Sequence, residues 1–345
     1  MNPSRLVGPL SVLALTLLAT ACGDGERSRG PLEIKFGHVG QPGSLYEVVT
    51  EEFARRANER LAGSAEVVVF GSSQLGGDEV LLQKLKLGTI DLSLPSTVMS
   101  STIDAFGLFE MPYLVRDRAH MGRIEEEIVW PVLAPLAEAE GYKLLAVWEN
   151  GFRHVTNNIR PIRSPHDLSG IKLRTPRGRW RVKLFQAYGA NPSPMPYSEV
   201  FIALQTGVMD GQENPLSQIY GAKLQEVQEY LSLTGHVYTP AFVTVGLNRW
   251  NRLPEAVQTA LAETARDMQA FVYESAERLD AEILAELTAQ GMQVNEGNHE
   301  AFLDASGPIY DEFGQEVPGG QDLVTRALEL GDPVPSSTSG AGTER

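Results

Sequence analysis

The stretch Ser169-Gly-Ile-Lys-Leu-Arg-Thr-Pro176 predicts where a strand ends and which side chain stands at that end. Apolar or β-branched residues alternate there with Lys172 and Arg174, which is the period of a β-strand. Pro176 has no N–H to donate to a neighbouring strand, so the strand is expected to stop before it. Ligands of open α/β sheets bind beyond the carboxyl ends of strands, which makes Arg174 a candidate binding residue.

The segment around this strand is strongly basic, although the whole chain has a net charge of -15. Between residues 153 and 183 the only acid is Asp167. One interpretation is a site for a small anion, and the other is a solvated helix face with ion pairs that stabilise the fold. The position of Arg174 at the end of a predicted strand favours the interpretation as an anion site. The basic residues are Arg153, Arg160, Arg163, Lys172, Arg174, Arg177, Arg179, Arg181 and Lys183.

Length and composition are those of a globular protein with room for two domains. The chain has 345 residues, of which 42% are hydrophobic and 21% charged. The acidic net charge argues against nucleic acid as a partner, because phosphates would repel it. A single cysteine excludes any disulfide within the chain, so we expect burial of apolar surface to stabilise the core.

The N-terminus resembles an export signal. Arg5 precedes the short apolar run Leu6–Leu18, and small residues lead to Cys22. This pattern resembles a bacterial lipoprotein signal over residues 1–22, with Cys22 lipidated and residues 23–30 as a tether to the membrane. Simple cleavage near Ala21, with a free thiol, is the alternative. The apolar run is too short to predict a transmembrane helix.

Strand and helix patterns alternate from residue 32 to residue 94, which predicts a parallel, doubly wound sheet. Asp78 is expected to cap the second helix, and 90–94 is the third strand. The polarity changes near residue 150, where a second lobe is expected to begin after a strand over 142–148. A further short strand is expected over 208–210.

The C-terminal third returns to the first lobe and then crosses both lobes. Residues 238–248 are apolar and β-rich and are expected to rejoin the first sheet. No Pro or Gly interrupts 255–290, so a helix of roughly 54 Å is expected there. Residues 331–345, rich in Ser, Gly and Thr, are expected to be disordered.

Several motifs in this order resemble the extracytoplasmic solute receptors of tripartite ATP-independent periplasmic (TRAP) transporters, the DctP-like family. The resemblance covers residues 32 to 313. It rests on Lys35-Phe-Gly-His38, Ser72-Ser-Gln-Leu-Gly76, Leu87-Gly-Thr-Ile-Asp91, Met111-Pro-Tyr113, Asp167-Leu-Ser-Gly-Ile-Lys-Leu-Arg-Thr-Pro176, Gly189-Ala-Asn-Pro-Ser-Pro-Met195, Ser198-Glu-Val-Phe-Ile-Ala-Leu-Gln-Thr-Gly207, Asp210-Gly-Gln-Glu-Asn-Pro215 and Leu253-Pro254.

This family implies a periplasmic-binding-protein-like α/β fold, with two lobes, a hinge and a long helix bridging both. Lobe I would comprise 31–150 plus 239–279, and lobe II 151–238 plus 280–330. In the cleft, the resemblance assigns the substrate carboxylate to Arg174. The second arginine would be Arg153, the amide on the same anion Asn214, and the aromatic wall Tyr197.

Other side chains are candidates for selecting among acids. His38, Gln74 and Ser96 follow or lie near the first three predicted strands, and His236 lies near the predicted lobe crossing. Sialic-acid receptors of this family have Asn where this chain has Arg177, and Glu where it has Ser96. These departures argue against sialic acid. They leave a smaller sugar acid, such as a uronate or aldonate, or a C4-dicarboxylate or keto acid, with a diacid favoured if Arg177 turns inward.

The resemblance implies a periplasmic monomer that binds an organic acid, closes around it and docks on a sodium-coupled permease with a small and a large membrane subunit. No cofactor or metal is expected. An exported enzyme is the first rival, but His299-Glu300 lacks the second His of a zinc motif and no G-x-S-x-G motif occurs. The second rival is a two-lobed receptor for an ATP-driven (ABC) importer or a sensor kinase.

Overall fold

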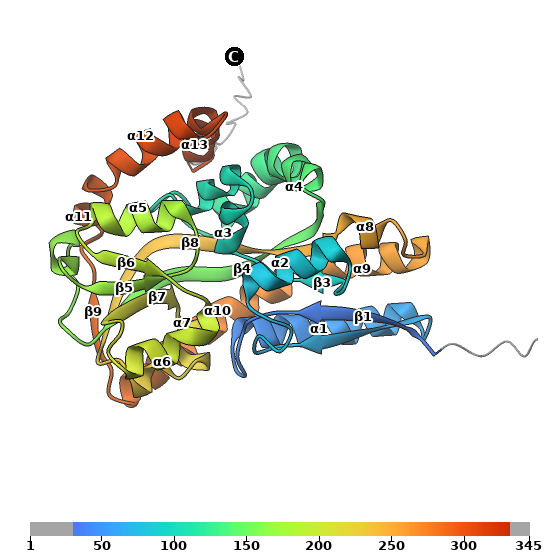
Figure 1. The fold of residues 1–345 in the computed structure, drawn as a ribbon, viewed down its shortest axis with the longest axis horizontal. Coiled ribbons are helices and arrows are strands. Elements are labelled where there is room, and N and C mark those ends of the chain that lie inside the picture. Colours follow the sequence, from blue (N-terminus) through green and yellow to red (C-terminus); the bar gives the residue numbers. More distant parts are fainter. Residues whose placement is uncertain (1–29, 332–345) are drawn as a thin grey trace, which may run out of the picture. The chain divides into compact units, whose positions relative to one another are not determined.

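One continuous sheet in the order β2-β1-β3-β8-β4-β7-β5-β6, with β9 added beside β8, runs through the part of the chain that the structure describes (Figure 1). The structure is a computed structural model that describes residues 30–331. The predicted signal peptide with Cys22, residues 23–29 of the tether and residues 332–345 of the tail lie outside this range. The strands are β1 (Leu32–Gly37), β2 (Ala65–Phe70), β3 (Leu92–Ser93), β4 (Tyr142–Asn157), β5 (Lys172–Thr175), β6 (Asn191–Pro194), β7 (Gly211–Pro215), β8 (Tyr230–Gly246) and β9 (Gln293–Glu296).

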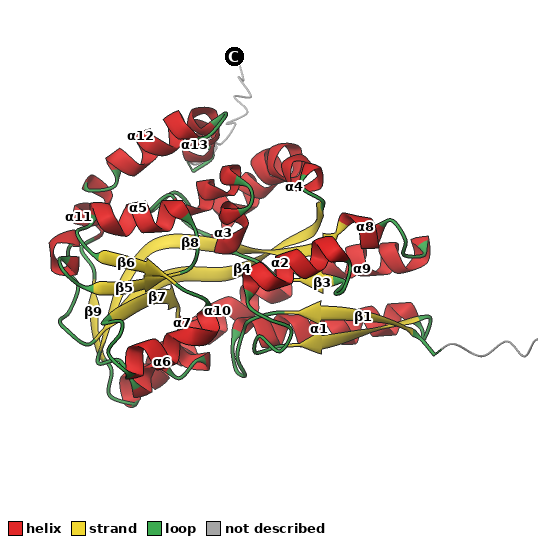
Figure 2. Cartoon of the chain, in the orientation of Figure 1, coloured by secondary structure: helices red, strands yellow, loops and turns green. Residues whose placement is uncertain are grey.

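Helices lie on both faces of this sheet (Figure 2). The α-helices are α1 (Leu45–Leu61), α2 (Asp78–Leu87), α3 (Arg118–Ile124), α4 (Ala134–Ala139), α5 (Arg179–Ala187), α6 (Val200–Gln205), α7 (Leu216–Gly221), α8 (Leu247–Trp250), α9 (Glu255–Asp267), α10 (Gln269–Ala289), α11 (His299–Asp304), α12 (Gly307–Glu316) and α13 (Gly320–Glu329). Short 3-10 turns are η1 (Thr97–Ser101), η2 (Asp104–Glu110), η4 (Pro165–Leu168), η5 (Tyr197–Glu199) and η6 (Leu224–Glu226), and η3 (Glu125–Leu133) is a π-helix.

The first half of the sheet is parallel, as predicted. β1 pairs in parallel with both β2 and β3, so α1 and α2 are the connections between parallel strands. The N-cap Ser44 accepts the Glu47 N–H, and Gly88 ends α2 in the left-handed region at φ 69°. The predicted cap was wrong by one residue: Gly77 is the N-cap, and Asp78 is the first residue of α2. β3 is also shorter than the predicted strand over 90–94.

Two long strands cross the whole sheet. β4 and β8, of 16 and 17 residues, pair antiparallel along most of their lengths. They extend beyond the predicted strands, which ended at residue 148 and began at residue 238. Their register shifts between Glu149 and Gly151, where Asn150 is left unpaired. Such a bulge bends a strand without ending it. Both strands pass the predicted lobe boundaries uninterrupted, and those boundaries stay a prediction.

In the second half of the sheet, the stretch Ser169–Pro176 forms a strand that ends before Pro176, as predicted, but the position of the next strand differs from the prediction. β5 ends at Thr175 and pairs in parallel with β6 and β7. The strand expected over 208–210 is instead β7, Gly211–Pro215, which pairs antiparallel with β4. No strand was predicted over its polar Gln-Glu-Asn sequence. These residues are buried because their side chains are paired with one another and with β4.

The predicted long helix is divided in two. α9 and α10 cover the predicted range apart from a one-residue interruption at Met268, whose side chain is fully buried. α10 alone has 21 residues and is therefore roughly 32 Å long. It packs on α1, beside the first half of the sheet, and on α7, beside the second half. Gly291 follows with φ 100° and ends the helical run as predicted.

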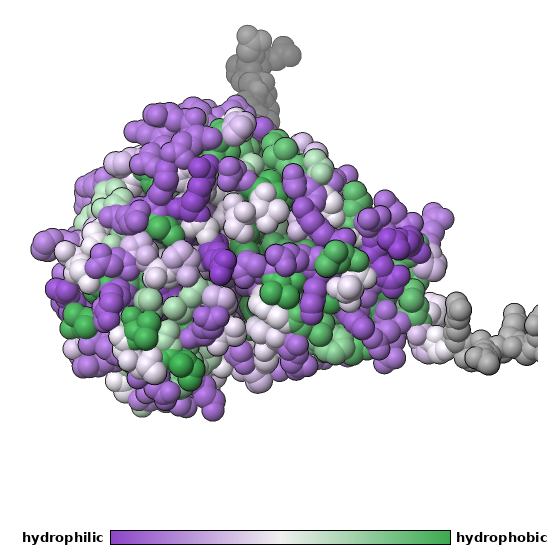
Figure 3. Space-filling view, viewed as in Figure 1, coloured by the Kyte–Doolittle hydropathy of each residue, from purple (hydrophilic) through white to green (hydrophobic). Residues whose placement is uncertain are grey.

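Apolar side chains on the face shown in Figure 3 are interspersed with hydrophilic ones. Within residues 30–331, none of the helices has both the length and the hydropathy that crossing a bilayer requires.

Replacing Gly246 by Ala is predicted to destabilise the protein. A Cβ at this position would lie 1.9 Å from the backbone oxygen of Leu85, near the end of α2. A backbone atom cannot move aside as a side chain can, so we expect a loss of at least about 1–3 kcal/mol in the free energy of unfolding, measured by urea denaturation.

The matched control is Gly122→Ala, within α3, where a Cβ would meet nothing within 4 Å. This substitution should raise the free energy of unfolding by about 0.5–1 kcal/mol. Equal denaturation midpoints for the two variants would contradict the proposed contact between α2 and β8.

Candidate functional site

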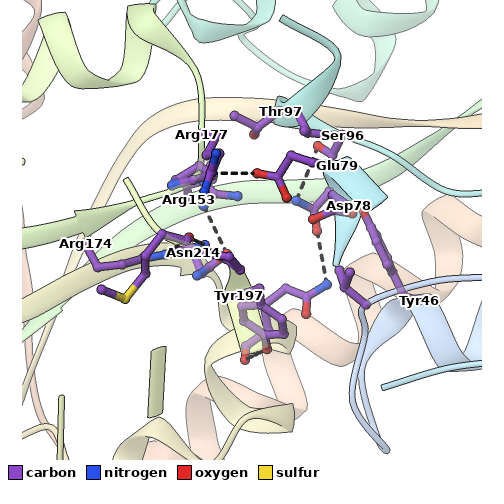
Figure 4. A pocket seen from close by; sticks show the side chains of 17 residues that line it. Tyr46, Asp78, Glu79, Ser96, Thr97, Arg153, Arg174, Arg177, Tyr197 and Asn214 are labelled. Carbon is purple, nitrogen blue, oxygen red and sulfur yellow. Dashed lines mark hydrogen bonds and ion pairs between the residues drawn. The ribbon is translucent and has the colours of Figure 1, made fainter. Parts of the chain in front are cut away.

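A pocket lies where β3, β5 and β7 end beside the crossing strands β4 and β8 (Figure 4). It comprises about 520 Å³, part of it open to solvent. Such a position, beyond strand ends in an α/β sheet, is where ligands bind in folds of this class. The lining residues are Val39, Tyr46, Asp78, Glu79, Ser96, Thr97, Val98, Asn150, Arg153, Arg174, Pro176, Arg177, Met195, Pro196, Tyr197, Asn214 and Gln218.

Arg174 is buried in this pocket, with 3% of its surface exposed. Its Nε and Nη2 both donate to the carbonyl oxygen of Met195, at 3.0 and 2.6 Å. Among the described residues Nη1 has no hydrogen-bond partner, and the guanidinium forms no ion pair. Burial lowers the pKa of Arg174 to about 10, so the side chain is still charged at neutral pH. The pocket therefore holds a desolvated cation without a counter-anion of its own.

Arg153, in contrast, forms a buried ion pair with Glu213. Its Nε and Nη2 donate to the two carboxylate oxygens at 2.6 and 2.9 Å, and neither side chain is more than 2% exposed. Nη2 also donates to Asn214 Oδ1 at 3.0 Å. Burial alone would raise the pKa of Glu213, but Arg153 and Arg181 lower it well below its usual range. The carboxylate is thus ionised, and the charge of Arg153 is balanced within the protein.

A second buried arginine extends this network away from the pocket. Arg181 pairs with Glu213 at 2.6 Å and with Glu110 at 2.8 Å. Burial raises the pKa of Glu110, against the effect of Arg181. Among the described residues, Arg153 and Arg181 are thus ion-paired with Glu213 and Glu110, whereas Arg174, the third buried arginine, forms no ion pair.

Two acids from the first turn of α2 face the arginines across the pocket. Burial and the neighbouring Glu79 raise the pKa of Asp78 to about 7, although Arg174 and Arg153 oppose this shift. Glu79 Oε1 lies 3.3 Å from Arg177 Nε, and the Arg177 side chain is 58% exposed. Arg177 thus stands at the rim of the pocket, with its charge countered by Glu79.

Neutral polar groups complete the wall. Thr97 Oγ1 and Gln218 Oε1 are buried, and neither has a hydrogen-bond partner among the described residues. Tyr197 donates its hydroxyl to the Gln218 backbone oxygen at 2.6 Å, and Ser96 donates to the Pro240 oxygen at 2.6 Å. Buried polar atoms without partners are rare in proteins, so this wall is suited to a ligand that brings hydroxyl groups.

The structure brings six of the predicted binding residues to the pocket and leaves three outside its lining. His38 is buried beside Tyr46, and burial lowers its pKa to about 4. Gln74 is exposed on the loop after β2. His236 lies behind the pocket, with Nε2 3.1 Å from Glu213 Oε2. The six at the pocket are Arg174, Arg153, Asn214, Tyr197, Ser96 and Arg177.

Sequence reasoning missed most of the opposite wall. Asp78 was considered only as a helix cap, and Glu79, Thr97, Asn150 and Gln218 were not considered as binding residues. The signal that could have found them is their position: each follows a loop or bend at the same edge of the sheet. Proximity to Arg174 is a tertiary property that no local pattern contains.

The basic segment of 153–183 proves to be mostly an ion-pair network. Six of its nine cations form ion pairs with carboxylates in the described structure. Of the three others, Arg160 and Arg163 are exposed, whereas Arg174 is buried. Ion pairing therefore explains most of the segment, and an anion site at Arg174 stays a prediction.

A pocket beyond the strand ends of an α/β sheet, with a buried arginine in its wall, is typical of a receptor that binds small solutes. The bacterial extracellular solute-binding protein family 7 (DctP) matches residues 36–316, and the chain belongs to this family. The predicted family is thereby confirmed, and the chain is an extracytoplasmic solute receptor of the TRAP type, not an enzyme. Within residues 30–331, no group of three or more His, Cys, Asp or Glu side chains is placed to hold a metal ion.

Three relatives illustrate the family. The 2,3-diketo-L-gulonate-binding periplasmic protein of Escherichia coli is 32% identical over 86% of this chain and 92% of its own. The TRAP solute-binding protein of Polaromonas bound to D-erythronate is 31% identical, with a TM-score of 0.83, over 88% of this chain and 100% of that one. The TRAP protein of Sulfurospirillum deleyianum with bound succinate is 30% identical, with a TM-score of 0.82, over 87% and 99%. These similarities confirm the predicted fold class.

Replacing Glu213 by Gln is predicted to destabilise the protein severely. The substitution leaves Arg153 and Arg181 buried without their shared anion, and breaking a buried pair from one side costs about 3–5 kcal/mol. The free energy of unfolding at pH 7, from urea denaturation, measures this loss.

Glu312→Gln is the matched control, because Glu312 pairs with Lys183 at the surface and is 49% exposed. Its loss should stay within about 1 kcal/mol. If Glu213→Gln proved as stable as this control, the buried network would not be stabilising.

Proposed function

We propose that this receptor binds a sugar acid, meaning a polyhydroxylated monocarboxylate such as an aldonate or a uronate, with the carboxylate on Arg174. The observation that carries the proposal is the buried guanidinium without a counter-anion. A guanidinium and a carboxylate match in a planar, two-pronged geometry. Asn214 and Arg153 line the same pocket and would contact the second oxygen of the ligand carboxylate, or the ligand atoms next to it.

The rest of the ligand is a hydroxylated chain or ring. Thr97 Oγ1 and Gln218 Oε1 lack partners in the described structure and would receive hydroxyl groups. Asp78 offers a carboxyl that accepts or donates a hydrogen bond, according to its protonation. A C4-dicarboxylate or a keto acid is the next candidate, since a relative was solved with succinate, but such ligands would leave more of these polar atoms unpaired.

Receptors of this kind act by closing. A ligand that contacts both walls of the pocket adds interactions that only the closed state makes, so it shifts the population toward that state. The closed receptor then delivers the acid to a TRAP permease with a small and a large membrane subunit. Lipidation of Cys22 would hold the receptor near this permease, at the periplasmic surface of the membrane.

Replacing Arg174 by Ala or Lys is predicted to weaken acid binding by about 2–5 kcal/mol, which is roughly 30-fold to several-thousand-fold in Kd. Lysine keeps the charge but not the planar pair of donors, so both variants should lose affinity. Isothermal titration with D-erythronate, D-galactonate and D-glucuronate measures this effect.

Arg163→Ala is the control, because Arg163 is an exposed cation of the same basic segment. It should bind as the unaltered protein does. A Kd for Arg174→Lys equal to that of the unaltered protein would refute the carboxylate clamp.

Acid binding is also predicted to weaken as pH rises from 6 to 8. The pKa of Asp78 is raised to about 7 in the empty pocket. A bound anion near it, which also neutralises Arg174, raises this pKa further, so binding takes up protons. The slope of log Kd against pH should be positive, with a limit of one decade per pH unit for one proton.

Asp78→Asn should flatten this pH profile, and titrations in buffers of different ionisation enthalpy should detect the proton uptake directly. A profile that is unchanged by Asp78→Asn would show that another group carries the linkage. The buried histidine closest to the network, His236, has a pKa lowered to about 4 and does not titrate in this range.

A further inference from the structure

A second cation and a second anion meet at the rim of the pocket. Arg177 follows β5 directly after Pro176, and Glu79 lies in the first turn of α2. Glu79 Oε1 is 3.3 Å from Arg177 Nε, and both side chains line the pocket (Figure 4). Without Glu79, the pocket would present two arginines free of a carboxylate: Arg174 inside and Arg177 at the rim.

From this arrangement we infer that Glu79 is a specificity-determining residue, which makes the receptor reject dicarboxylates by neutralising Arg177. The inference rests on the proposed function, since it assumes that one carboxylate of the ligand occupies Arg174. A diacid was expected to be favoured if Arg177 turned inward, but Arg177 stands at the rim and is paired with Glu79.

The charges across the pocket support this inference. A diacid held on Arg174 must place its second carboxylate within the remaining pocket. The groups that face it there are Glu79, which already holds Arg177, and Asp78, which is partly ionised at neutral pH. Like charges brought together in an interface are strongly unfavourable. A terminal hydroxyl meets no such repulsion and can donate to either carboxylate.

Specificity of this kind comes from a repulsive group as well as from an attractive one. The Arg174 clamp recognises any carboxylate, so it cannot by itself separate a monoacid from a diacid. Glu79 does so from the opposite wall, and its exposed fraction of 28% leaves it accessible to a ligand. The pair is partly solvated, so the discrimination should weaken as salt increases.

The test uses pairs of acids that differ only in the oxidation of a terminal CH2OH to a carboxylate: D-erythronate with meso-tartrate, D-galactonate with galactarate, and D-gluconate with D-glucarate. Titration at low ionic strength gives the ratio of the diacid Kd to the monoacid Kd. The unaltered receptor should prefer the monoacid of the best-bound pair by about 100-fold or more. In Glu79→Gln this ratio should fall at least tenfold, through tighter diacid binding.

Two further variants isolate the cause. Arg177→Gln keeps the repulsive Glu79 and should keep or strengthen the monoacid preference. In the double variant Glu79→Gln with Arg177→Gln, the diacid gain should be smaller than in Glu79→Gln alone, because the freed cation is gone. Glu312→Gln, a surface substitution remote from the pocket, is the control and should leave the ratio unchanged.

Each other outcome contradicts the inference in a distinguishable way. If Glu79→Gln weakened both acids of a pair equally, the ion pair would only hold the two walls together and would not select. A diacid preference in the unaltered receptor would refute the inference and leave the Arg174 clamp intact. Failure of the unaltered receptor to bind any of the six acids would refute the proposed function itself.

Discussion

The site depends on one constraint: a guanidinium removed from water needs an anion, and Arg174 has none within the described protein. Among the residues that the structure describes, its only hydrogen-bond acceptor is the neutral backbone carbonyl of Met195. Burial of an uncompensated charge is unfavourable, and here it appears as a lowered pKa. In the proposed complex a carboxylate would supply the missing anion, so the free energy that burial of Arg174 costs the empty protein would contribute to the affinity for the ligand.

Among the buried arginines that the structure describes, the lack of an anion is restricted to Arg174, because the neighbouring Arg153 and Arg181 are ion-paired. Arg153 lies in the same pocket, yet it donates three hydrogen bonds to Glu213, two to the carboxylate and one to the backbone oxygen, and a fourth to Asn214. Glu213 also binds Arg181, so one carboxylate on β7 orders cations from β4 and α5. The pairing is complete at the Glu213 carboxylate but not at Arg181, whose Nε and Nη2 have no hydrogen-bond partner among the described residues. Asn214 belongs to this network and lines the same pocket as Arg174.

The sequence was informative where structure is local. The period of two before Pro176 predicted the end of β5, and Gly88 and Gly291 predicted helix ends, because caps and turns depend on a few adjacent residues. It failed at β7, where buried polar side chains pair with residues distant in the sequence: Glu213 with Arg153 and Arg181, and Gln212 with Thr156. It failed in the same way for Asp78, Glu79 and Gln218, whose roles depend on which elements the sheet brings together.

The path of β4 and β8 explains how one pocket can combine walls from both halves of the sheet. Both strands run through both halves of the sheet without a break, and the bulge at Asn150 is one of the three places where their register shifts. Asn150 also lines the pocket, donates to Thr239 Oγ1 at 3.2 Å across the strand pair, and accepts from Gln218 Nε2 at 3.3 Å. The bend in the sheet and the polar wall of the site are therefore built from the same residue. Gln218 thus connects the polar wall of the pocket to the strand pair at its bulge.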